Sequence, residues 1–142
     1  MSLATIVAAL RPVIDAVTGI AACYPRIPET QPPVDPFAII ETASGSVIDA
    51  GADFDKLTYA VNVYVMTKRN GDLWAEQGVV LPYVNSIPDA LRSAFTLGGL
   101  TYGTRYGDPA WELVDAEIDN QNYLGVKFAL LYKERAVATF SG

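Results

Sequence analysis

The chain has 142 residues, of which 51% are hydrophobic and 18% charged, so a single domain over residues 1–142 is predicted and global disorder is excluded. Acidic residues outnumber basic ones by 16 to 10, and the formal charge of −6 disfavours long-range attraction to nucleic acid or anionic lipid. The sequence contains no histidine, which removes the most common general base and transition-metal ligand and excludes many enzyme classes.

The first predicted element is an amphipathic helix over residues 2–18, bent at Pro12, with apolar side chains at intervals of three and four. No basic region precedes its apolar stretch, and Arg11 and Asp15 lie within it, so we interpret it as a mature helix rather than a secretory signal. No window of 18 apolar residues predicts a membrane-spanning helix.

Prolines dominate the next segment, residues 20–36. Five of them fall within twelve residues, and the loss of so many amide donors excludes a helix or a central strand: Pro25, Pro28, Pro32, Pro33 and Pro36. An extended surface segment is therefore predicted. A short strand over 37–42 follows, and the small and acidic residues of 43–53 predict a mobile hairpin or loop.

The clearest strand prediction covers residues 57–66, where side chains alternate in character with a period of two. A helical stripe over 73–95 comes next, and Pro82 interrupts its backbone hydrogen bonds. Ser86 and Asp89 match a capping box, with Pro88 in the first turn. A kink or restart near Asn85 is therefore predicted.

The last third of the chain predicts a glycine-rich loop over 97–107, a strand over 111–118, a turn at 119–122 and a long strand over 123–135. Even-numbered residues of the last strand are apolar and are expected to face the core. The order is helix, two strands, helix, then two or three strands. It predicts an α+β domain in which two helices cover one face of a mainly antiparallel sheet of four to five strands.

Few residues have the chemistry of a catalytic or metal site. Asp115, Glu117 and Asp119 could bind Ca²⁺ or act as an acid–base pair, but on a strand they lie about 7 Å apart on one face and lack the EF-hand spacing. The glycines of 97–107 fit no phosphate-binding motif, and Cys23 has no histidine to activate it. We therefore predict a non-enzymatic protein with an inert thiol, no metal and no cofactor.

Exposed aromatic and basic side chains are the better candidates for contacts with protein partners. Tyr24, Pro25, Tyr102 and Tyr106 lie in predicted loops and cannot all reach the core. The odd face of the last strand mixes apolar and basic side chains, and we expect it to meet an acidic patch of a neighbouring subunit, either 37–55 or 108–119. Its candidate interface residues are Tyr123, Lys127, Leu131, Lys133 and Arg135.

Several short features follow one another in a recognisable order. They are the N-terminal amphipathic helix, Tyr24-Pro25 and the proline segment, a strand entering as Pro36-Phe37-Ala38-Ile39-Ile40, the alternating strand, the Gly71-Asp72 turn, a helix reading LPYVNSIPDAL, the segment 97–100, and a closing Tyr123-Leu124-Gly125-Val126 strand. Together they resemble the tail terminator (tail completion) proteins of long-tailed bacteriophages and prophages, over nearly the whole chain.

The resemblance implies an α+β fold and a ring, usually of six subunits, that caps the completed tail tube and joins it to the head connector. The expected partners are other copies of the chain, the tail tube protein and the connector protein, and the expected location is the head–tail junction of the virion, after assembly in the host cytoplasm. DNA would pass through the ring without specific binding, and Asp49 and Asp53 are the expected bore-lining residues. The resemblance carries no catalytic residue onto this chain.

Two alternatives remain open at the level of sequence. One keeps the phage context and makes the chain a head-closure, neck or minor tail protein. The other is a small-molecule-binding or hydrolytic α+β domain, whose site would use the 97–108 loop and the nearby carboxylates.

Overall fold

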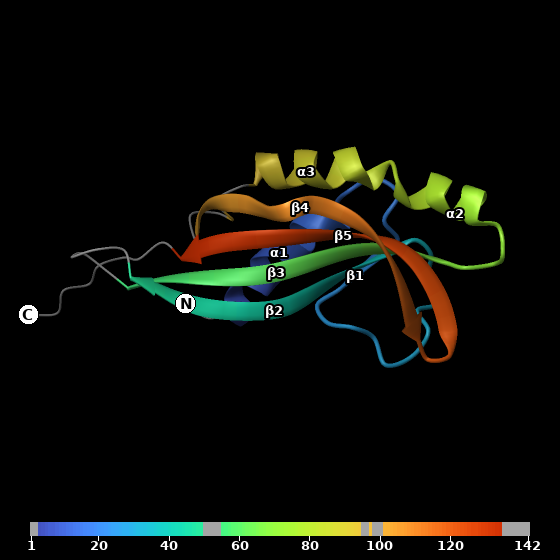
Figure 1. Ribbon diagram of the computed structural model, residues 1–142, viewed down its shortest axis with the longest axis horizontal. Coiled ribbons are helices and arrows are strands. Elements are labelled where there is room, and N and C mark those ends of the chain that lie inside the picture. Colours follow the sequence, from blue (N-terminus) through green and yellow to red (C-terminus); the bar gives the residue numbers. More distant parts are fainter. Residues whose placement is uncertain (1–2, 50–54, 95–96, 98–100, 135–142) are drawn as a thin grey trace, which may run out of the picture.

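The computed structural model describes residues 3–49, 55–94, 97 and 101–134 (Figure 1). Within this part of the chain, the elements are α1 (Leu3–Asp15), β1 (Ala22–Tyr24), β2 (Phe37–Asp49), β3 (Asp55–Lys68), α2 (Leu73–Val80), α3 (Tyr83–Ser93), β4 (Thr101–Ile118) and β5 (Gln121–Glu134). The strands form one sheet in the order β1-β2-β3-β5-β4. Only β1 and β2 pair in parallel, so the predicted α+β fold with a mainly antiparallel sheet is confirmed.

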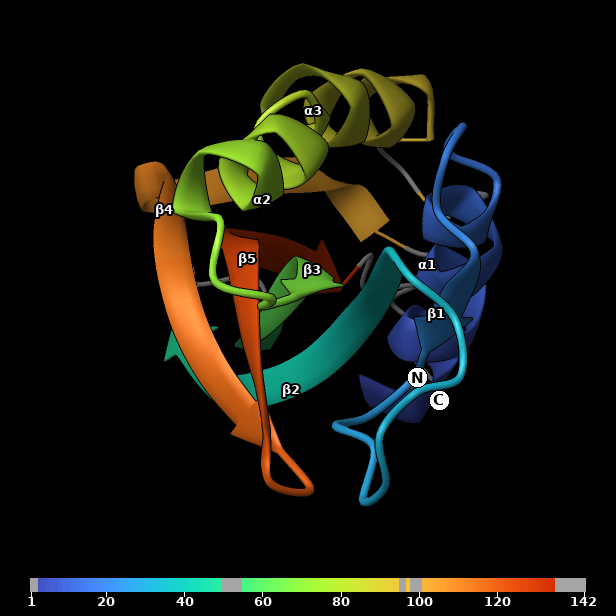
Figure 2. The same ribbon diagram turned by 90° about the vertical axis from the view of Figure 1, so that its right-hand side faces the viewer.

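The main core lies between the helices and one face of the sheet. Apolar side chains of α1, α2 and α3 pack against alternate residues of β2, β3 and β5, and the even-numbered residues of β5 belong to this core as predicted. Figure 2 shows the sheet curving around this space, with α1 on one side and α2 and α3 above. Burial of a single stripe of each helix therefore fixes the helices on the sheet.

The proline segment forms the edge of the sheet. β1 pairs with the first three residues of β2, and the chain then runs outside the sheet until Pro36, whose carbonyl accepts a hydrogen bond from the Ala21 amide at 2.9 Å. An edge strand tolerates nearby prolines because one side of it makes no ladder hydrogen bonds. The prediction of an extended surface segment is right in outline, but it omitted β1.

Of the hairpin or loop predicted from residue 43, the loop is wrong for residues 43–49, which continue β2 as one strand of a hairpin with β3. They pair with β3 as far as Asp49 opposite Asp55, after a register shift between Thr42 and Ser44. Small residues have low strand propensity by themselves, but pairing with the strongly alternating β3 overrides that preference. Residues 50–54 lie outside the described residues.

The predicted helix over 73–95 breaks earlier than expected. α2 ends at Val80 and α3 begins at Tyr83, because Pro82 has no amide hydrogen for the α2 ladder. Ser86 lies inside α3, where its hydroxyl donates to the Pro82 carbonyl at 3.3 Å. The predicted capping box at Ser86 and the restart near Asn85 are therefore wrong.

The loop predicted at 97–107 is wrong from residue 101 onward, because β4 already begins there. β4 is the other edge strand, and register shifts between Thr101 and Thr104 and between Tyr106 and Trp111 accommodate its glycines and its proline. The predicted turn after β4 is confirmed. Asp119 and Asn120 have φ angles of 49° and 64°, as a two-residue hairpin turn of type I′ requires.

A second, smaller apolar cluster lies on the opposite face of the sheet, and the sequence did not predict it. Its buried members come from β2, β3, β4 and β5: Phe37, Ile39, Met66, Ile118 and Tyr123. The rings of Phe37 and Tyr123 meet edge to face with their centroids 5.2 Å apart, and Tyr24 meets Phe37 in the same way at 5.9 Å. The β4–β5 hairpin and the proline segment cover this cluster, since Tyr24 and Val34 pack against it.

Candidate interaction surfaces

Exposed apolar side chains gather at one edge of the molecule. Of the seven large hydrophobic side chains exposed in the described part of the chain, four belong to α2 and its C-terminal cap and two to β4: Leu73, Trp74, Val79, Leu81, Trp111 and Leu113. Trp74 is 86% exposed, although aromatic side chains of this size usually contribute to cores and interfaces. Such a concentration is typical of a surface that contacts another protein.

Acidic side chains border this surface. On β4 the side chains of residues 111, 113, 115 and 117 share one face, because alternate residues of a strand point the same way. Asp115 and Glu117 therefore continue the row that Trp111 and Leu113 begin, and all four are exposed. Asp72, which caps α2 by accepting the Ala75 amide at 3.2 Å, borders the surface next to Trp74. We call α2 with this face of β4 the α2–β4 surface.

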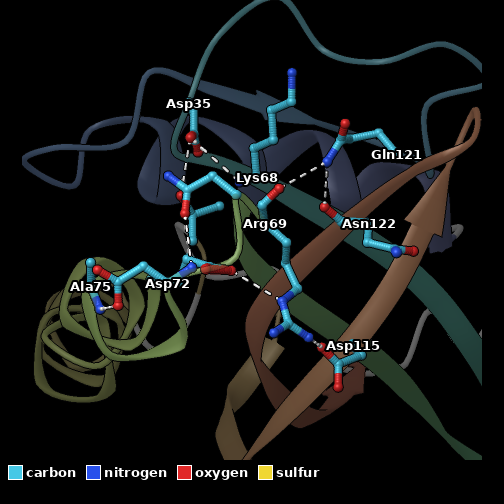
Figure 3. Close-up of polar contacts among 11 residues, drawn as sticks. Asp35, Lys68, Arg69, Asp72, Ala75, Asp115, Gln121 and Asn122 are labelled. Carbon is cyan, nitrogen blue, oxygen red and sulfur yellow. Dashed lines mark hydrogen bonds and ion pairs between the residues drawn. The ribbon is translucent and has the colours of Figure 1, made fainter.

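Arg69 holds α2 against the β4–β5 hairpin (Figure 3). Its guanidinium binds Glu76 of α2 at 3.1 Å and Asp115 of β4 at 3.2 Å, and its amide donates to the Asn122 carbonyl at 2.9 Å. The amide nitrogen of the Gln121 side chain donates to the Arg69 carbonyl at 3.2 Å. Because Glu76 is only 3% exposed, this ion pair fixes the orientation of the α2–β4 surface.

Asp35 ties the end of the proline segment to β3. Its Oδ2 accepts hydrogen bonds from the Thr67 hydroxyl at 3.0 Å and from the Lys68 amide at 3.4 Å. Further along the same segment, the Gln31 side chain donates to the Asp119 carbonyl at 2.9 Å. The proline segment is thus attached to the sheet on both sides of the second apolar cluster.

An open groove of about 500 Å³ lies at the opposite edge, between α1 and the start of the proline segment. Its lining is small and largely apolar: Ala4, Val7, Ala8, Arg11, Pro25 and Thr42. The Nε of Arg11 donates to the Cys23 carbonyl at 2.9 Å, which holds the guanidinium at this edge. We call this hollow the α1–β1 groove.

Cys23 lies beneath the α1–β1 groove and is buried. The pKa of its thiol is raised to about 12, chiefly by burial and also by the negative charge of Asp15, while Arg11 opposes the shift. A thiol with this pKa carries almost no thiolate at neutral pH, so it is a poor nucleophile.

A smaller cavity of about 260 Å³ lies on the sheet face opposite the helices, with Ile27 of the proline segment among its lining residues. Two of its polar members, Tyr64 and Lys127, are already paired. The Tyr64 hydroxyl donates to Glu41 at 3.0 Å, and Lys127 lies 3.6 Å from Glu112. Burial and this hydrogen bond raise the pKa of Tyr64 to about 12.

The predicted interface residues separate into different environments. Tyr123 is 2% exposed and packs on Phe37, so its assignment to an interface is wrong, because an odd-numbered residue of β5 faces the second cluster. Lys127 and Leu131 share that face and are half-buried. Tyr24 also packs on Phe37, whereas Pro25 is exposed and lines the α1–β1 groove.

For the other predicted residues, the structure describes the backbone without the side chain, or describes neither. Tyr102 and Tyr106 belong to β4 and Lys133 to β5, and their side chains lie outside the described residues. Asp49 ends β2, and its side chain likewise lies outside the described residues. Asp53 and Arg135 lie outside them altogether.

The carboxylates considered as a metal site do not converge. Asp115 binds Arg69, Glu117 is exposed two residues away, and Asp119 forms the hairpin turn. Over the ranges that the structure describes, no group of three His, Cys, Asp or Glu side chains is arranged to hold a metal ion.

The sequence reasoning missed the α2–β4 surface. The signal was present, since α2 reads Leu-Trp-Ala-Glu-Gln-Gly-Val-Val and its apolar residues are not confined to one stripe. Placing Leu73 in one helical stripe with the apolar residues of 80–95 put it in the core, whereas 46% of it is exposed.

Comparison with known proteins adds no relative from which a function could be transferred. The chain matches no protein-family model, and a search of curated proteins found no match. Among the described helices, none has both the length and the apolar character needed to cross a membrane.

Proposed function

We propose that the chain is a structural virion protein that forms a ring, with six copies as the expected number, at the end of a phage tail tube and joins the tube to the head connector. The observation that carries the proposal is the order of elements on the chain. A helix, an extended proline segment, a hairpin, a broken helix and a second hairpin follow one another as the resemblance to tail terminator proteins implies.

The motifs that carry the resemblance occupy positions that build this fold. Phe37-Ala38-Ile39-Ile40 begins β2 and is buried on both faces of the sheet, while Tyr123-Leu124-Gly125-Val126 contributes to both apolar clusters. The helix motif supplies Tyr83, Ile87 and Leu91 to the main core. These motifs therefore support the fold that the proposal requires.

The surface of the molecule supports assembly better than catalysis. The α2–β4 surface lies at one edge of the sheet and the α1–β1 groove at the other. Two different surfaces of this kind are what a head-to-tail contact in a ring requires. The 260 Å³ cavity falls below the range of about 300–1,000 Å³ usual for ligand sites, and its Tyr64 and Lys127 are already paired. This cavity therefore gives the small-molecule alternative little support.

The charge of the chain suits the passage of DNA through such a ring. Six copies would carry a formal charge of −36, six times the −6 of one chain. A lining without excess basic residues would avoid the phosphate contacts that hold duplex DNA in place. Within this proposal, Asp49 and Asp53 remain the candidate bore-lining residues.

Electron microscopy of the purified chain mixed with tail tubes tests the proposal, the tubes being assembled from the tube protein encoded in the same phage genome. We expect rings of about 92 kDa, six times the 15.3 kDa of the chain, seated on tube ends. The heat-unfolded chain is the control and should leave tube ends bare. Binding along the sides of the tubes, or tube ends left bare by the folded chain, would contradict the proposal.

A further inference from the structure

The α2–β4 surface and the α1–β1 groove lie at opposite edges of one sheet. The strand order places β4 at one end and β1 at the other, and α1 packs beside β1 and β2 while α2 packs over β3 and β5. Figure 2 shows α2 and β4 on one side of the molecule and α1 and β1 on the other. A chain therefore cannot bring its own surface to its own groove, but two copies side by side can bring one of each together.

The shapes of the two regions are complementary. Trp74 projects from α2 with 86% of its side chain exposed, and Leu81 lies one heptad later on the same side of the helix. The groove of about 500 Å³ falls within the range of cavities that accommodate drug-sized ligands, so it has room for an indole ring. Ala4 and Ala8 keep one wall of the groove low, because their side chains are single methyl groups.

The charges of the two regions are also complementary. Asp72, Asp115 and Glu117 border the α2–β4 surface. Among the described residues that line the groove, Arg11 carries the one charge, and it is exposed and basic. Complementary potentials of this kind orient two partners as they approach and fix the register of the contact.

We propose that the α2–β4 surface of one copy docks into the α1–β1 groove of a second copy, with Trp74 in the groove and Arg11 against the acidic border. The inference rests on the proposed ring, whose subunit contact it names. The contact is head to tail, because the two surfaces differ, and each copy in a chain of copies keeps one free surface and one free groove until a ring closes.

Self-association measured by sedimentation equilibrium tests the energetic part of the proposal. Trp74→Ala and Ala8→Glu should each weaken association about tenfold or more, the first by removing an anchoring side chain and the second by placing a carboxylate in the groove. Both positions are exposed, so the variants should fold. The matched controls are Ile27→Ala, an exposed apolar residue outside both regions, and Asn85→Glu, an exposed position of α3, and both should associate as the parent chain does.

Disulfide trapping tests the geometry. Chains with Trp74→Cys are mixed with chains carrying Ala8→Cys under oxidation, and the mixture should give a mixed disulfide while neither variant alone gives more than the parent chain. Cys23 does not interfere, because it is buried and its thiol has a pKa of about 12. Self-linking of the Trp74→Cys variant would overturn the proposal, since it would show a twofold contact instead.

The ring and the contact can fail separately. Closed rings that form without the mixed disulfide, and that survive Trp74→Ala, would overturn this contact and leave the ring function standing. The mixed disulfide together with open filaments would support the contact and count against the ring. A chain that stays monomeric both alone and at tube ends would overturn both.

Discussion

The two faces of the sheet are covered by different kinds of structure. On one face, α1 and α3 bury apolar stripes and α2 buries Val80 against β2, β3 and β5. On the other, five buried side chains are covered by a hairpin and by a segment without regular structure, which is held by Asp35 and Gln31. The helix-covered core therefore depends mainly on packing, whereas the second cluster also depends on a few hydrogen bonds that keep its cover in place.

The largest effect should come from a matched pair of core substitutions. Phe128→Ala in the main core should lower the free energy of unfolding by about 3–5 kcal/mol, because rigid helices cannot close the cavity. Phe37→Ala in the second cluster should lower the free energy of unfolding by about 3 kcal/mol, at the lower end of this range, since the proline segment can move inward. Urea denaturation measures both losses, and a greater loss for Phe37→Ala would contradict the view that the proline segment adjusts more easily than the helices.

Gly125 tests how closely β5 approaches β3 beside the second cluster. A Cβ there would lie 2.8 Å from the Val65 carbonyl oxygen and 2.9 Å from the Met66 Cγ, so Gly125→Ala should destabilise the fold by about 1–3 kcal/mol. Gly78 in α2 is the control, because a Cβ there meets nothing within 4 Å. Gly78→Ala should stabilise the protein by about 0.5–1 kcal/mol, and thermal melts of the two variants should move in opposite directions.

Asp35 tests whether hydrogen bonds hold the cover of the second cluster. Asp35→Ala removes the acceptor for Thr67 and Lys68 and should cost about 1–2 kcal/mol, partly because the Thr67 hydroxyl is left buried. Limited proteolysis should then cut residues 25–34 faster. Glu29→Ala, at an exposed position of the same segment, should change neither measurement.

The last effect is absent at neutral pH and is a loss of stability at high pH. Cys23 and Tyr64 keep their protons in the folded chain up to a pKa of about 12, against 9.0 and 10.0 for the free groups. The unfolded chain therefore releases protons first, and the stability that these groups contribute is complete below pH 9 and declines up to about pH 12. Cys23→Ala should reduce the loss of stability that begins near pH 9, and Tyr64→Phe should reduce the loss that begins near pH 10. Denaturation of each variant across this pH range measures both effects.

Periodicity predicted the helix-covered core and left the second cluster unseen. The alternation of β3 and β5 identified the inward-facing residues, because one face of those strands meets the helices along their length. Phe37-Ala38-Ile39-Ile40 is apolar at every position, so no alternation shows which side chains face which way. The face of this segment that is turned away from the helices is buried by Tyr123 and Val34, and Tyr123 is distant from the segment in the sequence.

The candidate site was predictable only in part. Pro25 was identified from its place in an exposed segment, and it does line the α1–β1 groove. Trp74 was not singled out from the sequence, because its exposure depends on α2 ending at Val80, and that end depends on Pro82. Predicting the break three residues too late hid the most exposed aromatic side chain in the described part of the chain.

The pairing of β3 with β5 has a consequence for the timing of assembly. The β2–β3 and β4–β5 hairpins join neighbouring segments, whereas the β3–β5 ladder joins Lys68 to Tyr123 and Thr58 to Lys133 across the intervening helices. Contacts between residues so distant in sequence are slow to form, because loop closure must come first. Trp74 lies on α2, which packs on both β3 and β5, and β4 pairs with β5, so the complete α2–β4 surface needs this late ladder. Under the head-to-tail contact proposed above, a newly made chain would therefore present that surface only after its slowest folding step, which protects assembly from incomplete subunits.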